Sequence, residues 1–121
     1  MTRYLVATAT AATSAAAADY LAPKLDADDE VYVLTVEEEG VEVDQEALSV
    51  AQERFAGTAT VRTVRREGSP ASEIVAFVRE HDIDEVIVGP RREGGEGFGT
   101  IGTTTRTVLN NVEGPVFVVP K

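Results

Sequence analysis

Short apolar segments recur along the chain and predict β-strands. Each is bounded by polar or glycine-containing sequence and is rich in the β-branched and aromatic residues that fit a pleated sheet. The predicted strands are Tyr4–Thr8, Glu30–Val36, Thr58–Val64, Val86–Val88 and Pro115–Val119. The first of them is almost wholly apolar, which is typical of a strand that is buried on both faces.

Between these segments, apolar residues recur at the three- and four-residue spacing of an amphipathic helix. The predicted helices are Ala15–Leu21, Asp44–Phe55, Ala71–His81 and Thr103–Val112. Strands that alternate with helices favour an α/β fold, in which helices cover both faces of a parallel sheet. The length of 121 residues is that of one domain, so we expect a single domain over residues 1–121.

Local residues support the predicted helix ends. A cap within Thr10–Ser14 precedes the first helix, and Pro23 ends it. Asp44 is a plausible cap of the second helix. Ser69 is expected to cap the third helix, with Pro70 at its first helical position.

Composition excludes several classes of function. The chain has no Cys, so disulfides and thiol chemistry are ruled out, and its one His, His81, lacks the partners that catalysis or a zinc site requires. Its net charge of −10 disfavours binding to nucleic acid. The acidic turn Asp26–Glu30 predicts a solvated loop, because the Gly and Glu spacing of a calcium loop is missing.

The same composition suggests a location and a source. No signal peptide and no apolar stretch of membrane-spanning length are visible, so we expect a cytoplasmic protein without membrane contact. Nine Arg, two Lys and 21 acidic residues suit a protein from a high-salt cytoplasm, where charge repulsion is strongly screened. A halophilic source is therefore an expectation from composition.

A glycine-rich stretch follows the fourth predicted strand and leads to Thr103-Thr104-Thr105 at a helix start. This order of strand, glycine loop and helix N-terminus is the one that proteins use to hold phosphate. Gly97-x-Gly99-x-x-Gly102 is not the dinucleotide fingerprint, because the strand ends too early, at Gly89. Gly97-x4-Gly102-Thr103 is not a P-loop, because Thr103 stands where the Lys is needed.

A third pattern fits better. Gly89, two residues, Arg92, nine residues and then Gly102-Thr103 resembles the nucleotide loop of the universal stress protein family, Gly-x2-Gly-x9-Gly-Ser/Thr. Three of the four fixed positions match, and Arg92 replaces the second Gly. The flanking runs Asp84–Gly89 and Gly114–Pro120 are also similar to the family's fourth and fifth strands.

The resemblance implies an open five-stranded sheet of order 3-2-1-4-5, the fold of the adenine-nucleotide alpha-hydrolase-like proteins. It also implies a homodimer paired through the last strand, Pro115–Val119, whose apolar sequence fits an edge that recruits a partner. Adenine nucleotide, ATP (with Mg²⁺) or AMP, would bind in this fold without dedicated hydrolytic residues. Glu93 and Glu96 are the only carboxylates near the loop, and they look like solvated residues, so a hydrolase or transferase is the least favoured alternative.

The resemblance also assigns site residues. The adenine end of the ligand would lie near Thr8, Thr10 and Val36, because the ends of the first and second strands contact it in the family. The phosphates would lie on the loop and the following helix start, with arginines nearby. The loop candidates are Gly89, Arg91, Arg92, Gly102, Thr103 and Thr104, and Arg106 is a further possible phosphate contact.

Two departures from the family pattern leave the function open. Ala9 stands where the family has an Asp, and the loss of that charged acceptor costs roughly 1.5–3 kcal/mol of binding. A left-handed backbone at Arg92 would cost about 1–2 kcal/mol more, unless its side chain reaches a phosphate. The alternatives are thus a nucleotide- or phosphate-binding regulatory module and a dimeric stress-response interaction protein that binds no nucleotide.

Overall fold

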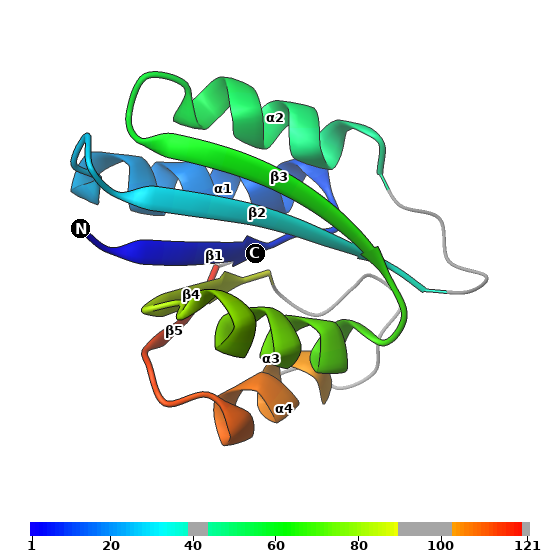
Figure 1. Ribbon diagram of the computed structural model, residues 1–121. Helices are drawn as coiled ribbons and strands as arrows, with labels where there is room; N and C mark the ends of the chain where they lie inside the picture. The colour runs from blue at the N-terminus through cyan, green and yellow to red at the C-terminus, as the bar shows by residue number, and fades with distance from the viewer. Residues whose placement is uncertain (39–43, 90–102, 120–121) are drawn as a thin grey trace.

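The computed structural model describes residues 1–38, 44–89 and 103–119, with only the backbone of residues 103 and 104. Its centre is a five-stranded parallel sheet in the order β3-β2-β1-β4-β5, as Figure 1 shows. The strands are β1 (Arg3–Ala7), β2 (Glu30–Glu37), β3 (Thr60–Glu67), β4 (Glu85–Val88) and β5 (Val116–Val118). The predicted fold class and strand order are confirmed.

Helices cover both faces of this sheet. They are α1 (Ala11–Leu21), the short 3₁₀ helix η1 (Ala22–Lys24), α2 (Glu46–Phe55), α3 (Pro70–His81) and α4 (Thr103–Asn111). In Figure 1, α1 and α2 lie on one face, and α3 and α4 lie on the other. Among the described residues, no helix is both long and apolar enough to cross a membrane.

Two apolar clusters hold the layers together, because successive side chains of each strand point to opposite faces. On the α1 and α2 side, Val6 packs with Leu21 and Phe55. On the α3 and α4 side, Leu5 packs with Phe77 and Val108. Leu5 and Val6 are both fully buried in β1, which confirms the prediction of a central strand with two covered faces.

The helix ends agree with the sequence in most places. The Oγ1 atom of Thr10 accepts the Thr13 N–H at 3.1 Å and caps α1. Pro70 occupies the first turn of α3. Ser69 holds the predicted N-cap position, but its side chain does not make the capping hydrogen bond expected of it. The fixed backbone angle of Pro70 favours a helix start there.

The centre of the sheet contains a change of direction in the chain. β1 and β4 are neighbours, with Ala7 paired with Val88, but α1 follows β1 onto one face and α4 follows β4 onto the other. The carboxyl ends of the two strands therefore meet where the two helices diverge. In open α/β sheets, ligands bind in the crevice outside the strand ends at such a switch point.

Candidate functional site

The switch point between β1 and β4 is the candidate site. Its described parts are the segment Thr8–Thr10 after β1, Gly89 after β4, the end of β2 and the first turn of α1. The start of α4 lies at the same edge of the sheet. The end of α4 leads into β5, and β5 begins beside Val86, near the start of β4, so α4 ends at the opposite edge and begins at this one. Apart from the first turn of α1, these parts were predicted to surround one ligand, and the fold brings them to one edge.

Gly89 lies directly against the first turn of α1. A Cβ atom at this position would be 2.7 Å from Cγ2 and 2.8 Å from Oγ1 of Thr13. Such distances are shorter than van der Waals contact, so a side chain here would push α1 away from the end of β4. Glycine at position 89 thus allows the close approach of β4 and α1, whether or not a ligand is bound.

Thr8 lies at the expected edge, but its hydroxyl is used inside the protein. It is buried; its Oγ1 donates to the Thr10 carbonyl at 3.0 Å and lies 2.9 Å from the Oγ of Ser14. Ser14 is also fully buried and donates to the Ala47 carbonyl of α2 at 2.6 Å. The network joins β1, α1 and α2, so the geometry gives Thr8 a positioning role and argues against direct contact through its hydroxyl.

Thr10 is the exposed polar residue of this segment. Its Oγ1 caps α1, as described above, and also donates to Oγ1 of Thr13 at 3.1 Å. Ala9, beside it, is partly exposed and offers no charge or hydroxyl. The segment after β1 therefore presents to a ligand one hydroxyl and the methyl group of an alanine.

Asp44 also lies at this edge, where it contacts the first residue of α1. Its Oδ2 accepts the N–H of Ala11, in the first turn of α1, at 2.8 Å, and its Oδ1 accepts the N–H of Glu46, the first residue of α2, at 2.9 Å. The Ala11 N–H, followed by that of Glu46, holds the pKa of the Asp44 carboxyl below its usual range. The sequence indicated Asp44 as the cap of α2, but Gln45 holds the N-cap position, without a capping side-chain bond, and Asp44, one residue earlier, bonds the first helical N–H. The second bond of Asp44, to α1, spans 33 residues and had no local signal in the sequence.

Val36 is the candidate contact at the end of β2. It is partly buried and packs at the edge of the core cluster formed with α3 and α4. β2 extends beyond the end of β1, because Ala7 is paired with Leu34 and the Thr35 hydroxyl donates to the Thr8 carbonyl at 3.1 Å. Val36 thus stands beyond the end of β1, in contact with the core and with part of its surface accessible.

The remaining predicted residues belong to the segment between β4 and α4. Thr103 and Thr104 form the first turn of α4, and their side chains are not described. Further along α4, Thr105 is buried and Arg106 is exposed. Arg91, Arg92 and Gly102 lie outside the described residues.

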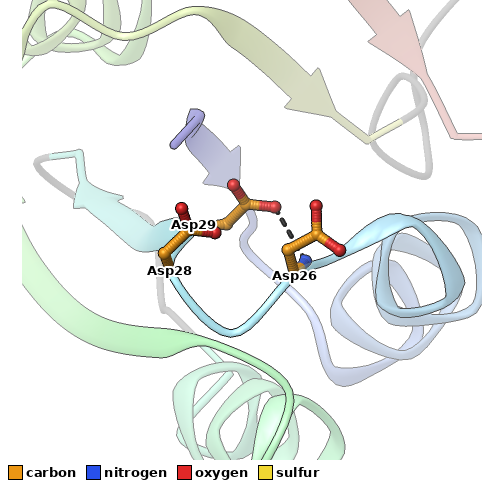
Figure 2. A group of neighbouring side chains, drawn as sticks. All are labelled: Asp26, Asp28 and Asp29. Atoms are coloured by element: carbon orange, nitrogen blue, oxygen red, sulfur yellow. Dashed lines mark hydrogen bonds between the residues drawn. The ribbon is translucent and has the colours of Figure 1, made fainter.

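A group of carboxylates lies at the opposite edge of the sheet, before β2. Carboxylate oxygens of Asp26, Asp28 and Asp29 all lie within 4.8 Å of one another (Figure 2). The prediction of a solvated loop is wrong for Asp29, which is only 4% exposed. Its oxygens accept the N–H groups of Asp26 and Thr2, each at 2.8 Å, and these bonds hold the pKa of its carboxyl below the usual range. Asp29 thus ties this turn to the start of β1.

His81 lies at the other end of the sheet from the switch point. It belongs to the last turn of α3, stacks on Phe77 with ring centroids 4.0 Å apart, and its carbonyl accepts a hydrogen bond from Arg3 at the start of β1. Its ring nitrogen Nδ1 lies 3.3 Å from the Phe77 carbonyl. His81 therefore packs at the amino edge of the sheet, where it takes no part in the candidate site.

Solved structures with the same architecture are known. The hypothetical protein MJ0577 superposes with a TM-score of 0.79 at 17% identity, over 99% of this chain and 96% of that one. A universal stress protein family protein from Arabidopsis thaliana, solved with AMP bound, gives 0.65 at 17% identity, over 98% and 91% of the two chains. The universal stress protein of Archaeoglobus fulgidus, in complex with dAMP, gives 0.58 at 19% identity, over 99% and 98%.

Sequence comparison gives the family directly. A search of curated proteins finds no match. The sequence pattern of the universal stress protein family, by contrast, matches residues 1–120, nearly the whole length. With the strand order and the switch point found above, this match shows that the chain belongs to the universal stress protein family.

Proposed function

We propose that this protein is a cytoplasmic regulatory module that binds an adenine nucleotide, AMP or ATP, at the carboxyl edge of its sheet. Inorganic phosphate would occupy the phosphate part of the same site. With ATP, Mg²⁺ would arrive on the nucleotide, coordinated by phosphate oxygens. A fold is shared by many functions, so the proposal depends on the geometry of the site itself.

The observation that carries the proposal is the switch point between β1 and β4. There the first turns of α1 and α4 lie at one edge of the sheet, and the close contact of Gly89 with Thr13 brings the end of β4 against α1. Helix N-termini carry free N–H groups and a positive dipole end, which favour an anion. At α1, Asp44 and Thr10 already accept two of these N–H groups, so the start of α4 is the one proposed for a ligand phosphate. The relatives solved with AMP and dAMP add support from similar folds.

The proposed ligand has two ends. Its adenosine part contacts Thr10 and Val36, beyond the ends of β1 and β2, and Thr8 positions this segment through its internal hydrogen bonds. Its phosphates lie toward the start of α4. The residues proposed for that end are Gly89, Arg91, Arg92, Gly102, Thr103 and Thr104.

Calorimetry with AMP, and with ATP and Mg²⁺, tests the proposal. Val36→Ala removes two methyl groups from the proposed base contact, which at ~0.8 kcal/mol per buried carbon weakens binding by about tenfold. Val64→Ala is the matched control, because Val64 is a partly buried valine of the same core cluster on β3. No heat with the wild-type protein at millimolar nucleotide, or equal losses in both variants, would rule the proposal out.

A second function has its own observation. Ala9 offers no charge and the hydroxyl of Thr8 is bonded internally, so the segment after β1 holds few groups for adenosine. These features favour a universal stress protein that acts through protein partners without nucleotide. Mass spectrometry of protein purified from its host discriminates the two functions, because a retained nucleotide contradicts the second.

We also propose that the protein is a homodimer paired through Pro115–Val119. β5 is the last strand of the sheet order, and Val118 is 36% exposed on it. An uncovered strand edge with apolar side chains favours pairing with another chain.

We further propose that the protein is halophilic. Its net charge of −10 supports a folded state that salt stabilises by screening the repulsion between acidic groups.

A further inference from the structure

Asp44 places a negative charge at the N-terminus of α1. Its carboxylate accepts the N–H of Ala11, the first residue of that helix, at 2.8 Å. An anion is what a helix N-terminus attracts, and here the chain supplies one of its own. The anion position of α1 is thus filled by a side chain, and a ligand phosphate at this helix would meet a negative charge.

The carboxylate is held in place by both helices that it joins. Its second oxygen accepts the N–H of Glu46 at 2.9 Å, and the Asp44 backbone carbonyl accepts the N–H of Ala47 at 3.1 Å. One turn further, Ser14 of α1 donates to the Ala47 carbonyl of α2 at 2.6 Å. Asp44 thus makes one hydrogen bond to α1 and two to α2, and the buried Ser14 hydroxyl joins the two helices. Its charge therefore has a defined position at the start of α1.

The same carboxylate has free capacity toward a ligand. Asp44 is exposed, and its two oxygens offer about four lone-pair sites, of which the two described bonds use two. An ionised carboxylate only accepts hydrogen bonds, so it suits the hydroxyl and amine donors of a nucleoside and disfavours phosphate. Ala9 and Thr10, which precede its partner Ala11 in the chain, carry no charge.

Resting on the proposed function, we propose that Asp44 is a specificity-determining residue of the nucleotide site. Its carboxylate accepts donors of the ligand's nucleoside part beside the first turn of α1 and excludes phosphate from that helix. The anionic end of the ligand is thereby directed to the start of α4. Asp44 thus fixes which end of the ligand faces which helix.

The test compares affinities of the full-length wild-type protein, Asp44→Asn and Asp26→Asn for adenosine, AMP and inorganic phosphate by calorimetry. The asparagine side chain in Asp44→Asn keeps one carbonyl oxygen and nearly the same shape but removes the charge. Its NH2 group cannot accept a hydrogen bond, so one of the two bonds from Ala11 and Glu46 is lost as well. Asp26→Asn removes an identical charge from an exposed Asp at the opposite edge of the sheet, so it controls for net charge. The measured quantity is the ratio of AMP affinity to adenosine affinity, in which a general loss of folded protein cancels.

Asp44→Asn should weaken adenosine binding by about tenfold, because a hydrogen bond to a charged acceptor becomes a neutral one. It should strengthen binding of inorganic phosphate by about fivefold, which is the Coulomb effect of one charge at roughly 4 Å in water. Because AMP and adenosine share the nucleoside, the loss of nucleoside contacts cancels in the ratio of their affinities. The AMP to adenosine ratio therefore rises by up to about fivefold through the phosphate effect alone, whereas Asp26→Asn leaves it at the wild-type value.

An unchanged ratio in Asp44→Asn, or the same rise in Asp26→Asn, would overturn the inference while leaving nucleotide binding intact. If the wild-type protein binds neither adenosine nor AMP, the proposed function fails, and the phosphate titration decides the inference alone. A gain of phosphate binding in Asp44→Asn only would then support exclusion of anions by Asp44. No gain would overturn it.

Discussion

The contact between Gly89 and Thr13 gives a prediction about how the switch point is built. Gly89→Ala adds a Cβ atom 2.7 Å and 2.8 Å from two side-chain atoms of Thr13. Overpacking of this size costs about 1–3 kcal/mol. Alanine offsets roughly 0.5–1 kcal/mol of this overpacking cost, because it loses less conformational entropy than glycine when the chain folds. The expected net loss in the free energy of unfolding is about 1–2 kcal/mol.

A double-mutant cycle identifies the cause. Thr13→Ala removes Cγ2 and Oγ1, the two atoms closest to the added carbon, and leaves only Thr13 Cβ, at 3.3 Å. The combination of Thr13→Ala with Gly89→Ala should therefore recover most of the stability, with a coupling energy of about 1 kcal/mol or more. The assay is urea unfolding followed by far-UV circular dichroism, with Tm as a second measure that falls by on the order of 5 °C in Gly89→Ala.

Gly57→Ala is the control for this cycle. Gly57 has φ +80° with no atom within 4 Å of an added Cβ, so its substitution costs about 1–2 kcal/mol through backbone conformation alone. That cost should be simply additive with Thr13→Ala. The reasoning is refuted if Gly89→Ala is as stable as the wild-type protein, or if Thr13→Ala rescues neither or both glycine variants.

Four further predictions concern stability and assembly. Ser14→Ala removes a fully buried donor to the Ala47 carbonyl and should cost about 1–2 kcal/mol in urea unfolding; a loss below ~0.5 kcal/mol contradicts it. Two backbone N–H groups lower the pKa of Asp29, so the stability that its carboxylate contributes is present above the unfolded pKa of about 3.9 and is lost as pH falls through the folded pKa. Asp29→Asn should therefore make the free energy of unfolding fall less steeply at acid pH, and an unchanged acid dependence would count against this. Val118→Lys should sediment as a monomer in analytical ultracentrifugation, because it places a charge at the proposed dimer edge. Leu109→Lys, at an exposed residue of α4, is the control and should remain a dimer; equal sedimentation of the two variants would contradict the prediction. Added KCl should raise Tm, and a higher Tm at low salt would argue against halophilic adaptation.

The fold could be predicted because its signals are local. The apolar runs and the helical spacing located the five strands and the four α-helices that the described residues form, with ends that differ from the structure by a few residues. Pro70 and Gly57 lie where backbone geometry requires their special angles, at a helix start and at a positive φ after α2. Strand order came from the resemblance to a family, because no local pattern states which strands are neighbours.

The candidate site was predictable only in part, because its bonds join residues far apart in the sequence. Thr8 was expected to face a ligand, but Ser14 and the Thr10 carbonyl take up its hydroxyl. Asp44 was expected to cap one helix, and it bonds to a second helix through Ala11. Such outcomes depend on the packing of α1 against α2, which neither composition nor spacing specifies.

Asp29 and Asp44 show how one residue type does opposite work at the two edges of the sheet. Both carboxylates accept two backbone N–H groups, and both have a lowered pKa for that reason. Asp29 is 4% exposed and its bonds close a turn onto β1, so its interactions lie within the fold. Asp44 is exposed beside a switch point, so its charge also acts on whatever enters there. Burial, with the same bonding pattern, thus separates the structural carboxylate of Asp29 from the carboxylate of Asp44, which we propose selects a ligand.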